Sequence, residues 1–183
     1  MTPAQTLTAI NVTAARPAFA PHTPDVVERV DRERIDTQNV VTAEDALKYM
    51  PNLMVRKRFV GDRNAPFAGR DFNELQSARG LVYADGLLLS NLLGPSYSYP
   101  PRWSLIAPDD IAQIEVLYGP FSALYPGNSI GSTVQITTKK PTKLEASLDT
   151  QLFTQRYHDP YGFAQSFGGN RESAHIADRV GRF

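Results

Sequence analysis

Alternating apolar and polar positions between residues 114 and 141 predict two β-strands joined by a short connection. Every second residue at the start of this stretch is apolar or aromatic: Ile114, Val116 and Tyr118. Gly119-Pro120 breaks the first strand and sets up one helical turn, because the fixed φ of proline suits that position. Residues 121–125 fit this turn, and residues 133–138 restore a β-rich alternation. The predicted order is strand, tight turn, short helix, glycine loop and strand.

Shorter elements are predicted upstream of this stretch. Three valines indicate a short strand: Val26, Val27 and Val30. The polar residues 31–35 predict a turn or a short helix. Thr42 and Asp45 have the spacing of a capping box, so a helix is expected to begin there, bury its apolar face and end at Pro51. Residues 53–59 then alternate as a strand with one basic side.

The middle of the chain combines a long loop with the most apolar segment. Residues 60–77 are polar and predict a loop, which at this length is usually functional or disordered. A strand and an Asp85-Gly86 turn are expected next. Leu87 to Leu93 is the most apolar run, and we expect it to be buried beside the other strands. An aromatic and proline-rich loop follows over residues 94–103.

The composition limits the classes of protein to which this chain can belong. The 183 residues allow one ordinary domain with some remainder, and a hydrophobic content of 42% is enough for a core. Nineteen basic and nineteen acidic residues cancel, so nucleic-acid binding is disfavoured. The chain has no cysteine, which excludes disulfides, thiolate metal sites and cysteine nucleophiles. This absence fits a periplasmic protein as readily as a cytosolic one.

No pattern in the sequence indicates an enzyme, a cofactor or a metal site. The chain lacks a G-x-S-x-G elbow, a P-loop and a G-x-G-x-x-G motif. The three histidines lie far apart, without metal-ligand spacing: His22, His158 and His175. Asp109 and Asp110 are interpreted as carboxylates at a helix N-terminus, where the dipole stabilises them, rather than as a catalytic pair.

The stretch 114–141 resembles the closing signature of the plug domain of TonB-dependent outer-membrane receptors. The resemblance lies in a strand ending in G-P, an A-L-Y, a glycine-bearing loop and a strand ending in T-K-K-P. Its signature residues are Glu115, Gly119, Pro120, Gly127 and Gly131. The helix that ends at Pro51, with the strand after it, is similar to an element near the start of the same domain. The alternative is an ordinary β-turn-helix-turn-β unit of an α/β domain.

Two positions depart from the family pattern. The family's R-G-F is replaced by Gly69-Arg70-Asp71-Phe72, so the plug-to-barrel contact of the family arginine is in doubt for Arg70. Tyr118 stands where an arginine is common, so an ion pair expected there is missing or rebuilt.

Beyond Pro141 the chain alternates again. Its first apolar-side positions are Leu144, Ala146, Leu148, Thr150 and Leu152. An alternation of ~10 residues is typical of an outer-membrane β-strand with its apolar side outward. Residues 157–160 predict a turn, 161–167 a second strand, 168–170 another turn and 173–183 a third strand. For each strand alone, a soluble edge sheet is the alternative.

The resemblance implies three parts. Residues 1–24 are expected to be a mobile extension, and residues 25–143 an α/β (α+β) plug domain with a small mixed sheet and short helices. Residues 144–183 would be the first two or three antiparallel strands of an incomplete transmembrane β-barrel. Such strands cannot close alone, because full receptors of this kind close ~22 strands around the plug. Residues 1–20 lack the pattern of a secretory signal, so we expect a removed signal, an upstream start or a stray fragment.

A segment of the extension is similar to the TonB box, by which such receptors recruit the inner-membrane energy transducer. Its residues nearly alternate and suit addition to a partner's sheet: Thr6, Leu7, Thr8, Ala9, Ile10, Asn11, Val12, Thr13 and Ala14. The resemblance therefore implies the TonB transducer as a partner. An ordinary disordered N-terminus is the alternative.

The loops expected at the apical end carry the candidate ligand-facing residues. Aromatic rings give rigid contact surface and arginines give a fixed fork of donors, which suits a planar or anionic ligand. The candidates are Arg63, Phe67, Arg70, Tyr97, Tyr99, Arg102 and Trp103. These side chains equally suit packing against a barrel wall. By family analogy the ligand is most often a ferric siderophore, while cobalamin, nickel complexes, haem and oligosaccharide stay open.

The residue patterns and the resemblance lead to two alternative functional hypotheses. The first is a TonB-dependent receptor in the outer membrane, with the plug inside the barrel, the N-terminus in the periplasm and energy-coupled uptake of a scarce nutrient. The second is a soluble plug-like binding module or a nonfunctional truncated remnant.

Overall fold

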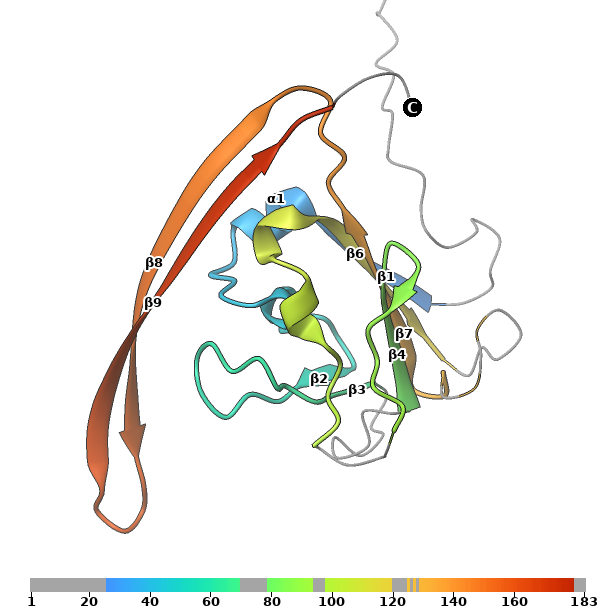
Figure 1. Ribbon diagram of the computed structural model, residues 1–183. Helices are drawn as coiled ribbons and strands as arrows, with labels where there is room; N and C mark the ends of the chain where they lie inside the picture. The colour runs from blue at the N-terminus through green and yellow to red at the C-terminus, as the bar shows by residue number, and fades with distance from the viewer. Residues whose placement is uncertain are drawn as a thin grey trace, which may run out of the picture.

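The computed structural model describes residues 26–69, 79–93, 98–119, 125, 127 and 129–179. A five-stranded mixed sheet, a two-stranded ribbon and several short helical turns make up its first part, to which we refer as the sheet domain (residues 26–143). A long hairpin follows and curves past the helical side of the sheet domain (Figure 1). The limits predicted for the three parts stay a prediction.

The sheet has the strand order β1-β6-β7-β4-β5. Its strands are β1 (Val26–Asp31), β6 (Ile111–Tyr118), β7 (Ser132–Thr138), β4 (Gly80–Ala84) and β5 (Leu87–Leu88). β4 and β7 pair in parallel, and the other neighbours are antiparallel. The mixed sheet and the strands predicted near residues 26, 114 and 133 are therefore confirmed, while the short helix predicted at 121–125 lies outside the described residues except Tyr125.

β6 is an interior strand, between β1 and β7, and is buried on both faces. Ile114, Val116 and Tyr118 join the apolar core on one face. On the other face Glu115 is buried as well, opposite Arg29 of β1 and Gln135 of β7. A strand covered on both faces has few exposed positions, which explains why its alternation in sequence is imperfect.

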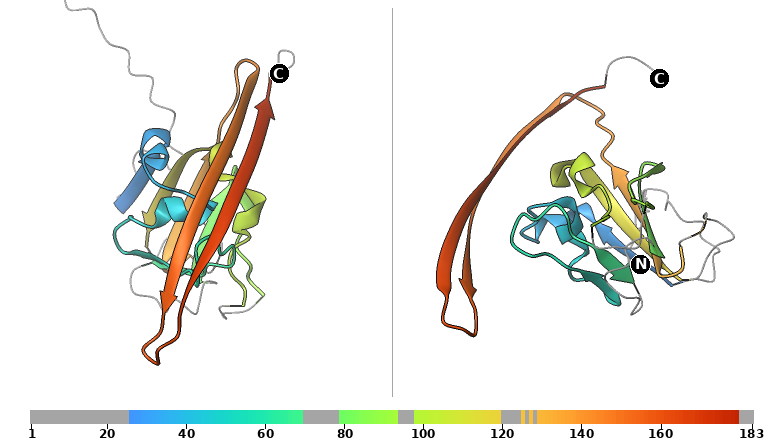
Figure 2. Two further views of the ribbon diagram at one scale, coloured as in Figure 1. Left: turned by 90° about the vertical axis from the view of Figure 1, so that its left-hand side faces the viewer. Right: turned by 60° about the horizontal axis from the view of Figure 1, so that its bottom comes forward.

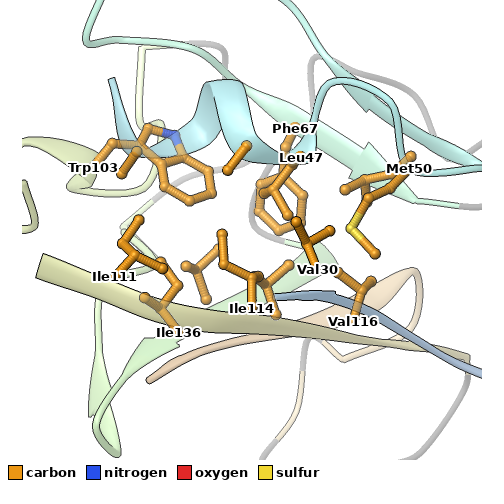
Figure 3. Packing of buried hydrophobic residues seen from close by; sticks show 14 of the residues in the cluster. Val30, Leu47, Met50, Phe67, Trp103, Ile111, Ile114, Val116 and Ile136 are labelled. Carbon is orange, nitrogen blue, oxygen red and sulfur yellow. The ribbon is translucent and has the colours of Figure 1, made fainter. Parts of the chain in front are cut away.

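The core lies between one face of the sheet and a layer of short segments (Figure 3). These segments are η1 (Ala43–Leu47), β2 (Leu53–Val55), β3 (Phe67–Gly69) and η3 (Trp103–Leu105). Trp103 and Phe67 meet edge to face with ring centroids 5.8 Å apart. The indole Nε1 of Trp103 donates a hydrogen bond of 2.8 Å to the carbonyl of Ala65, so its polar atom is satisfied inside the core.

The predicted capping box is present, although the helix it opens is a short 3-10 turn. The carboxylate of Asp45 accepts hydrogen bonds from the backbone N–H groups of Val41 (2.9 Å) and Thr42 (2.8 Å). Of the residues that the pattern assigned to the helix and its apolar face, Ala43, Ala46, Leu47 and Met50 are buried, whereas Tyr49 is exposed, so its assignment is corrected. The helical option for residues 31–35 is also confirmed, because α1 spans Arg32–Asp36.

Two strand predictions were too long. β2 ends at Val55 because its partner β3 has only three residues, and β3 lies inside the segment predicted as a loop.

The segment from Leu87 to Leu93, which we expected to be buried, is mostly exposed, with exposed fractions of 73% for Leu87 and 82% for Leu93. β5 stops after two residues because the side chain of Ser90, rather than a third strand residue, bonds to the backbone of β4. Its hydroxyl accepts a hydrogen bond from the Val82 N–H and donates one to the Gly80 carbonyl.

The hairpin consists of β8 (Glu145–His158) and β9 (Ala164–Ala177), which pair without a shift over their whole length. Figure 2 shows it as a long arch beside the sheet domain. Its turn is organised by the carboxylate of Asp159, which accepts from the N–H groups of Tyr161 and Phe163. The first strand is confirmed and extends further than predicted. The second and third predicted strands form one strand, because residues 168–170 pair with β8 instead of turning.

In the described parts of the chain, no helix is long and apolar enough to span a membrane.

Tyr118 forms a neutral contact where the family pattern led us to expect an ion pair. Its hydroxyl donates a hydrogen bond of 2.6 Å to the carbonyl of Pro51, which directly precedes the β2 region. Burial, together with the nearby carboxylate of Glu28, raises the pKa of Tyr118 to about 12, so the hydroxyl stays protonated and remains a donor.

Replacing Tyr118 with phenylalanine should therefore lower the free energy of unfolding by roughly 1–3 kcal/mol, because the Pro51 carbonyl loses its buried donor. Urea unfolding of the chain in detergent measures this change. Tyr49→Phe is the matched control, since the Tyr49 side chain is exposed. Equal stability of the Tyr118 variant and the native chain would contradict the assigned role.

Candidate functional site

The face of the hairpin that points toward the sheet domain is mainly polar. Residues 149, 151, 153 and 155 of β8 are partly buried there, as are residues 169, 171, 173, 175 and 177 of β9. The opposite face carries large exposed apolar side chains: Leu148, Leu152 and Ile176. The alternation predicted for the first of these strands is therefore present, and it continues through the second.

Two ion-pair contacts join β9 to a short turn of the sheet domain, η4 (Pro108–Asp110). Arg171 lies 2.6 Å from the carboxylate of Asp109 and 3.0 Å from that of Asp149. Nδ1 of His175 lies 2.8 Å from the carboxylate of Asp110, a contact that is an ion pair when the imidazole is protonated. Burial by itself would raise the pKa of Asp109, but hydrogen bonds from Ser173 and Arg171 outweigh it and lower this pKa below 3.8. Asp109 is therefore ionised at neutral pH.

Glutamine side chains on β8 bind backbone groups of the sheet domain. Nε2 of Gln151 donates a hydrogen bond of 3.2 Å to the carbonyl of Val40. The side-chain oxygen of Gln155 accepts one of 2.8 Å from the N–H of Val60. Gln151 pairs across the hairpin with Arg171, whereas Gln155 lies four residues further along β8, so the hairpin is attached at more than one point.

Phe153 makes an aromatic contact between the two parts. A Cβ on Gly169, its cross-strand partner, would lie 2.5 Å from the Phe153 ring, so the ring covers this glycine closely. On its other side the ring reaches Gly61, where an added Cβ would lie 3.7 Å away. Gly61 also has φ +83, which favours glycine. The ring fits between the two glycines.

The loop after β2 is organised by Asp62. Its buried carboxylate accepts hydrogen bonds from the Arg58 side chain (2.9 and 3.0 Å) and from the N–H of Asn64 (3.0 Å). The Arg58 hydrogen bond, partly opposed by burial, lowers the pKa of Asp62 to about 2. Since this carboxylate stays ionised, it fixes the loop that carries Arg63.

Cavities lie along the interface. One of about 490 Å³ is lined mainly by aromatic residues: Phe59, Phe153, Tyr157, Phe163 and Phe167. A polar one of about 190 Å³ has Glu44, Arg63 and Arg171 in its lining. A third, of about 670 Å³, extends over η1 and is lined by Asp45, Lys57 and Gln155 among others. Volumes of several hundred Å³ are large enough for small-molecule ligands.

Glu44 is a fully buried carboxylate in the lining of two of these cavities. One of its oxygens lies 3.4 Å from the ammonium of Lys57. Lys57 lies closer to Asp45, at 2.5 Å. Desolvation therefore dominates and raises the pKa of Glu44, although Lys57 partly opposes the shift.

The structure separates the residues that we predicted to face a ligand. Phe67 and Trp103 are each 1% exposed and pack in the core, so their assignment to a ligand-facing surface is corrected. Arg63, Tyr99 and Arg102 are exposed, and their role stays a prediction. Arg70, Tyr97, the segment 6–14 and Pro120 lie outside the described residues. In the described ranges no group of three or more His, Asp or Glu is placed to bind a metal ion.

The signature glycines close the sheet. The N–H of Gly119 donates to the carbonyl of Gly131 (3.3 Å), and the N–H of Gly131 donates to that of Arg79 (3.0 Å). The signature thus joins the end of β6 to the start of β7. Sequence reasoning missed the interface residues Gln151, Gln155, Arg171 and His175, since only the folded hairpin brings them to their partners.

Comparison with known families identifies this arrangement. Residues 21–133 match the TonB-dependent Receptor Plug Domain family, which is more than half of the chain. The chain belongs to this family. The match covers the sheet domain as far as residue 133, and we call this domain the plug below.

Relatives of known type support the assignment. The ferrioxamine receptor of Yersinia enterocolitica is 33% identical over 125 residues, and the ferrioxamine B receptor of Salmonella typhimurium is 28% identical over 119 residues. Each comparison covers 65% of this chain, and the chain spans 16% of each relative.

Solved structures show the same fold. The chain aligns with the ferric enterobactin receptor of Pseudomonas aeruginosa with a TM-score of 0.58 and 18% identity, over 87% of this chain and 23% of that one. For the siderophore receptor PirA of Acinetobacter baumannii the TM-score is 0.54 with 21% identity, over 80% and 22% of the chains.

Replacing Gly169 with alanine should weaken the attachment of the hairpin, because the added methyl group displaces the Phe153 ring from the plug. Overpacking of this kind costs about 1–3 kcal/mol. Gly168→Ala is the matched control, since a Cβ there meets nothing within 4 Å. Urea unfolding of both variants in detergent measures the difference. A Gly169 variant as stable as the Gly168 variant would rule out a tight fit of the ring.

Glu44 should make the stability of the plug depend on pH. Because its pKa is raised, the native state binds the proton more tightly, so this stabilisation is complete below pH 4.5 and is lost as pH rises through the folded pKa. Glu44→Gln mimics the protonated form. The variant should therefore match the native chain in acid and become more stable than it at neutral pH, as measured by urea unfolding at a series of pH values. Glu33→Gln, on the exposed side of α1, is the control. A pH-independent difference would contradict the expectation.

Proposed function

We propose that the chain is the plug and first barrel hairpin of a TonB-dependent outer-membrane receptor that takes up a ferric siderophore. The observation that carries this proposal is the hairpin itself: its apolar face points away from the plug, and its polar face binds the plug. This is the arrangement expected of a barrel wall between lipid and lumen. The related proteins are receptors rather than enzymes, which agrees with a transport function.

A ferric siderophore is the proposed cargo because the similar curated proteins are named ferrioxamine receptors. The exposed side chains Arg63, Tyr99 and Arg102 are the proposed ligand contacts on the plug, together with Arg70 and Tyr97. Arginine guanidinium groups suit an anionic complex, and tyrosine adds rigid contact area.

Transport would draw its energy from the inner membrane through the TonB transducer, bound by the segment 6–14 as an added strand. In this scheme the outer membrane is the location of the full-length receptor, with the extension in the periplasm. Ligand binding outside would make the segment accessible, and the pull of the transducer would rearrange the plug.

Deleting residues 6–14 from the full-length receptor should abolish uptake of a radiolabelled ferric siderophore and leave its binding to whole cells unchanged, because only coupling is removed. Deletion of residues 15–23 removes the same length from the same extension and is the control. Iron accumulation with a panel of ferric siderophores measures uptake.

Two results would contradict parts of the proposal. Unchanged uptake after deletion of residues 6–14 would refute the assignment of this segment. Failure of the native receptor to bind or accumulate any ferric siderophore of the panel would refute the cargo class.

A further inference from the structure

The η4 turn (Pro108–Asp110) is where the hairpin, the plug sheet and α1 meet. Its carboxylates contact β9, Asp109 through Arg171 at 2.6 Å and Asp110 through His175 at 2.8 Å. Arg32 binds the backbone here: its Nη1 donates to the carbonyl of Pro108 in the turn (2.8 Å) and to that of Ile111, the first residue of β6 (3.0 Å). Side chains thus tie the turn to the hairpin, and its backbone ties it to α1.

Arg32 occupies a particular place in the chain. It directly follows β1, which is an edge strand of the sheet and the first described element after the N-terminal extension. Its guanidinium also binds Asp36 within α1. β1 pairs with β6 from Val26 to Asp31, and Arg32 at its end adds a side-chain link to the η4 turn, so a displacement of β1 acts on this turn through Arg32 as well as through β6.

The interface around this turn differs from the plug interior. The apolar core is built from residues of the plug, and none of the described residues of β8 or β9 belongs to it. The contacts of the hairpin described above include the two carboxylate contacts of η4, the glutamine hydrogen bonds and the Phe153 ring. When a polar interface separates, its groups exchange their protein partners for water. Separating it therefore costs less free energy than separating a packed apolar interface.

We propose that Asp109, Asp110, Arg171 and His175 form a polar clamp that fastens the plug to the barrel wall, and that Arg32 couples its opening to displacement of β1. This inference rests on the proposed function, because it assigns the clamp to the step at which the transducer moves the plug. Arg171 has a second partner on its own hairpin, Asp149 at 3.0 Å, so its charge stays paired after Asp109 leaves. The clamp therefore opens without leaving this arginine uncompensated.

A reversible cross-link tests whether the clamp must open. In the full-length receptor, with any cysteines outside this region replaced, Asp110 and His175 are both changed to cysteine and joined by a short bis-methanethiosulfonate reagent. The present chain contributes no native cysteine. The joined receptor should still bind ferric siderophore but lose at least tenfold in uptake, and a reducing agent should restore uptake. The control joins His158→Cys to Ala164→Cys, a cross-strand pair next to the hairpin turn that links β8 to β9 alone.

Uptake that continues in the fully joined Asp110 and His175 receptor would overturn the clamp. Failure of the reduced receptor to bind or take up any ferric siderophore would instead count against the proposed cargo. A force measurement separates the two, because it needs no cargo. When the N-terminus of the membrane-embedded receptor is pulled, Asp109→Asn with Asp110→Asn should lower the force at which the plug first yields. Glu33→Gln with Glu145→Gln is the charge-matched control, and equal forces for the two double variants would also overturn the clamp.

Discussion

Buried carbonyl groups in irregular segments need hydrogen-bond donors that no strand ladder supplies, and this constraint shapes the plug. Short segments without a ladder form much of the layer that covers the sheet. Side chains supply the missing donors: Trp103 to Ala65, Tyr118 to Pro51, and Arg32 to Pro108. Each bond fixes a loop to an element that packs on the sheet. The hairpin uses the same device from outside, through Gln151 and the carbonyl of Val40.

Features formed by neighbouring residues could be predicted from the sequence, whereas the pairing of distant strands could not. The capping box at Thr42 and the Asp85-Gly86 turn involve neighbouring residues, and both form; Asp85 and Gly86 have the positive φ values that such a turn requires. Strand ends depend on distant partners. β5 ends early because Ser90 satisfies β4, and β9 continues through Gly168-Gly169 because β8 lies opposite, with the Phe153 ring over Gly169. Two glycines before an asparagine resemble a turn until that pairing is known.

The candidate site shows the same limit. Trp103 follows a proline and aromatic segment whose composition suits either a ligand or a core, and a bond to a carbonyl 38 positions away decides for the core. Arg171 lies in a polar stretch without any motif, and its partner Asp109 is 62 positions away. Asp109 and Asp110 are interpreted from the sequence as carboxylates at a helix N-terminus, and in the structure they lie in the three-residue η4 turn directly before β6. Their contacts with β9 required the register of a hairpin that was predicted as separate strands.

A plug that moves inside a barrel needs a core that does not depend on the wall. The described core satisfies this requirement, since its apolar residues end at Ile136, before the hairpin begins. The attachments described above are charged and amide groups and the Phe153 ring, and these separate without opening the core. The stability of the plug and its attachment therefore reside in different residues. Changes at the clamp alter the attachment and leave the folding of the plug intact, whereas changes at Tyr118 or Glu44 do the reverse.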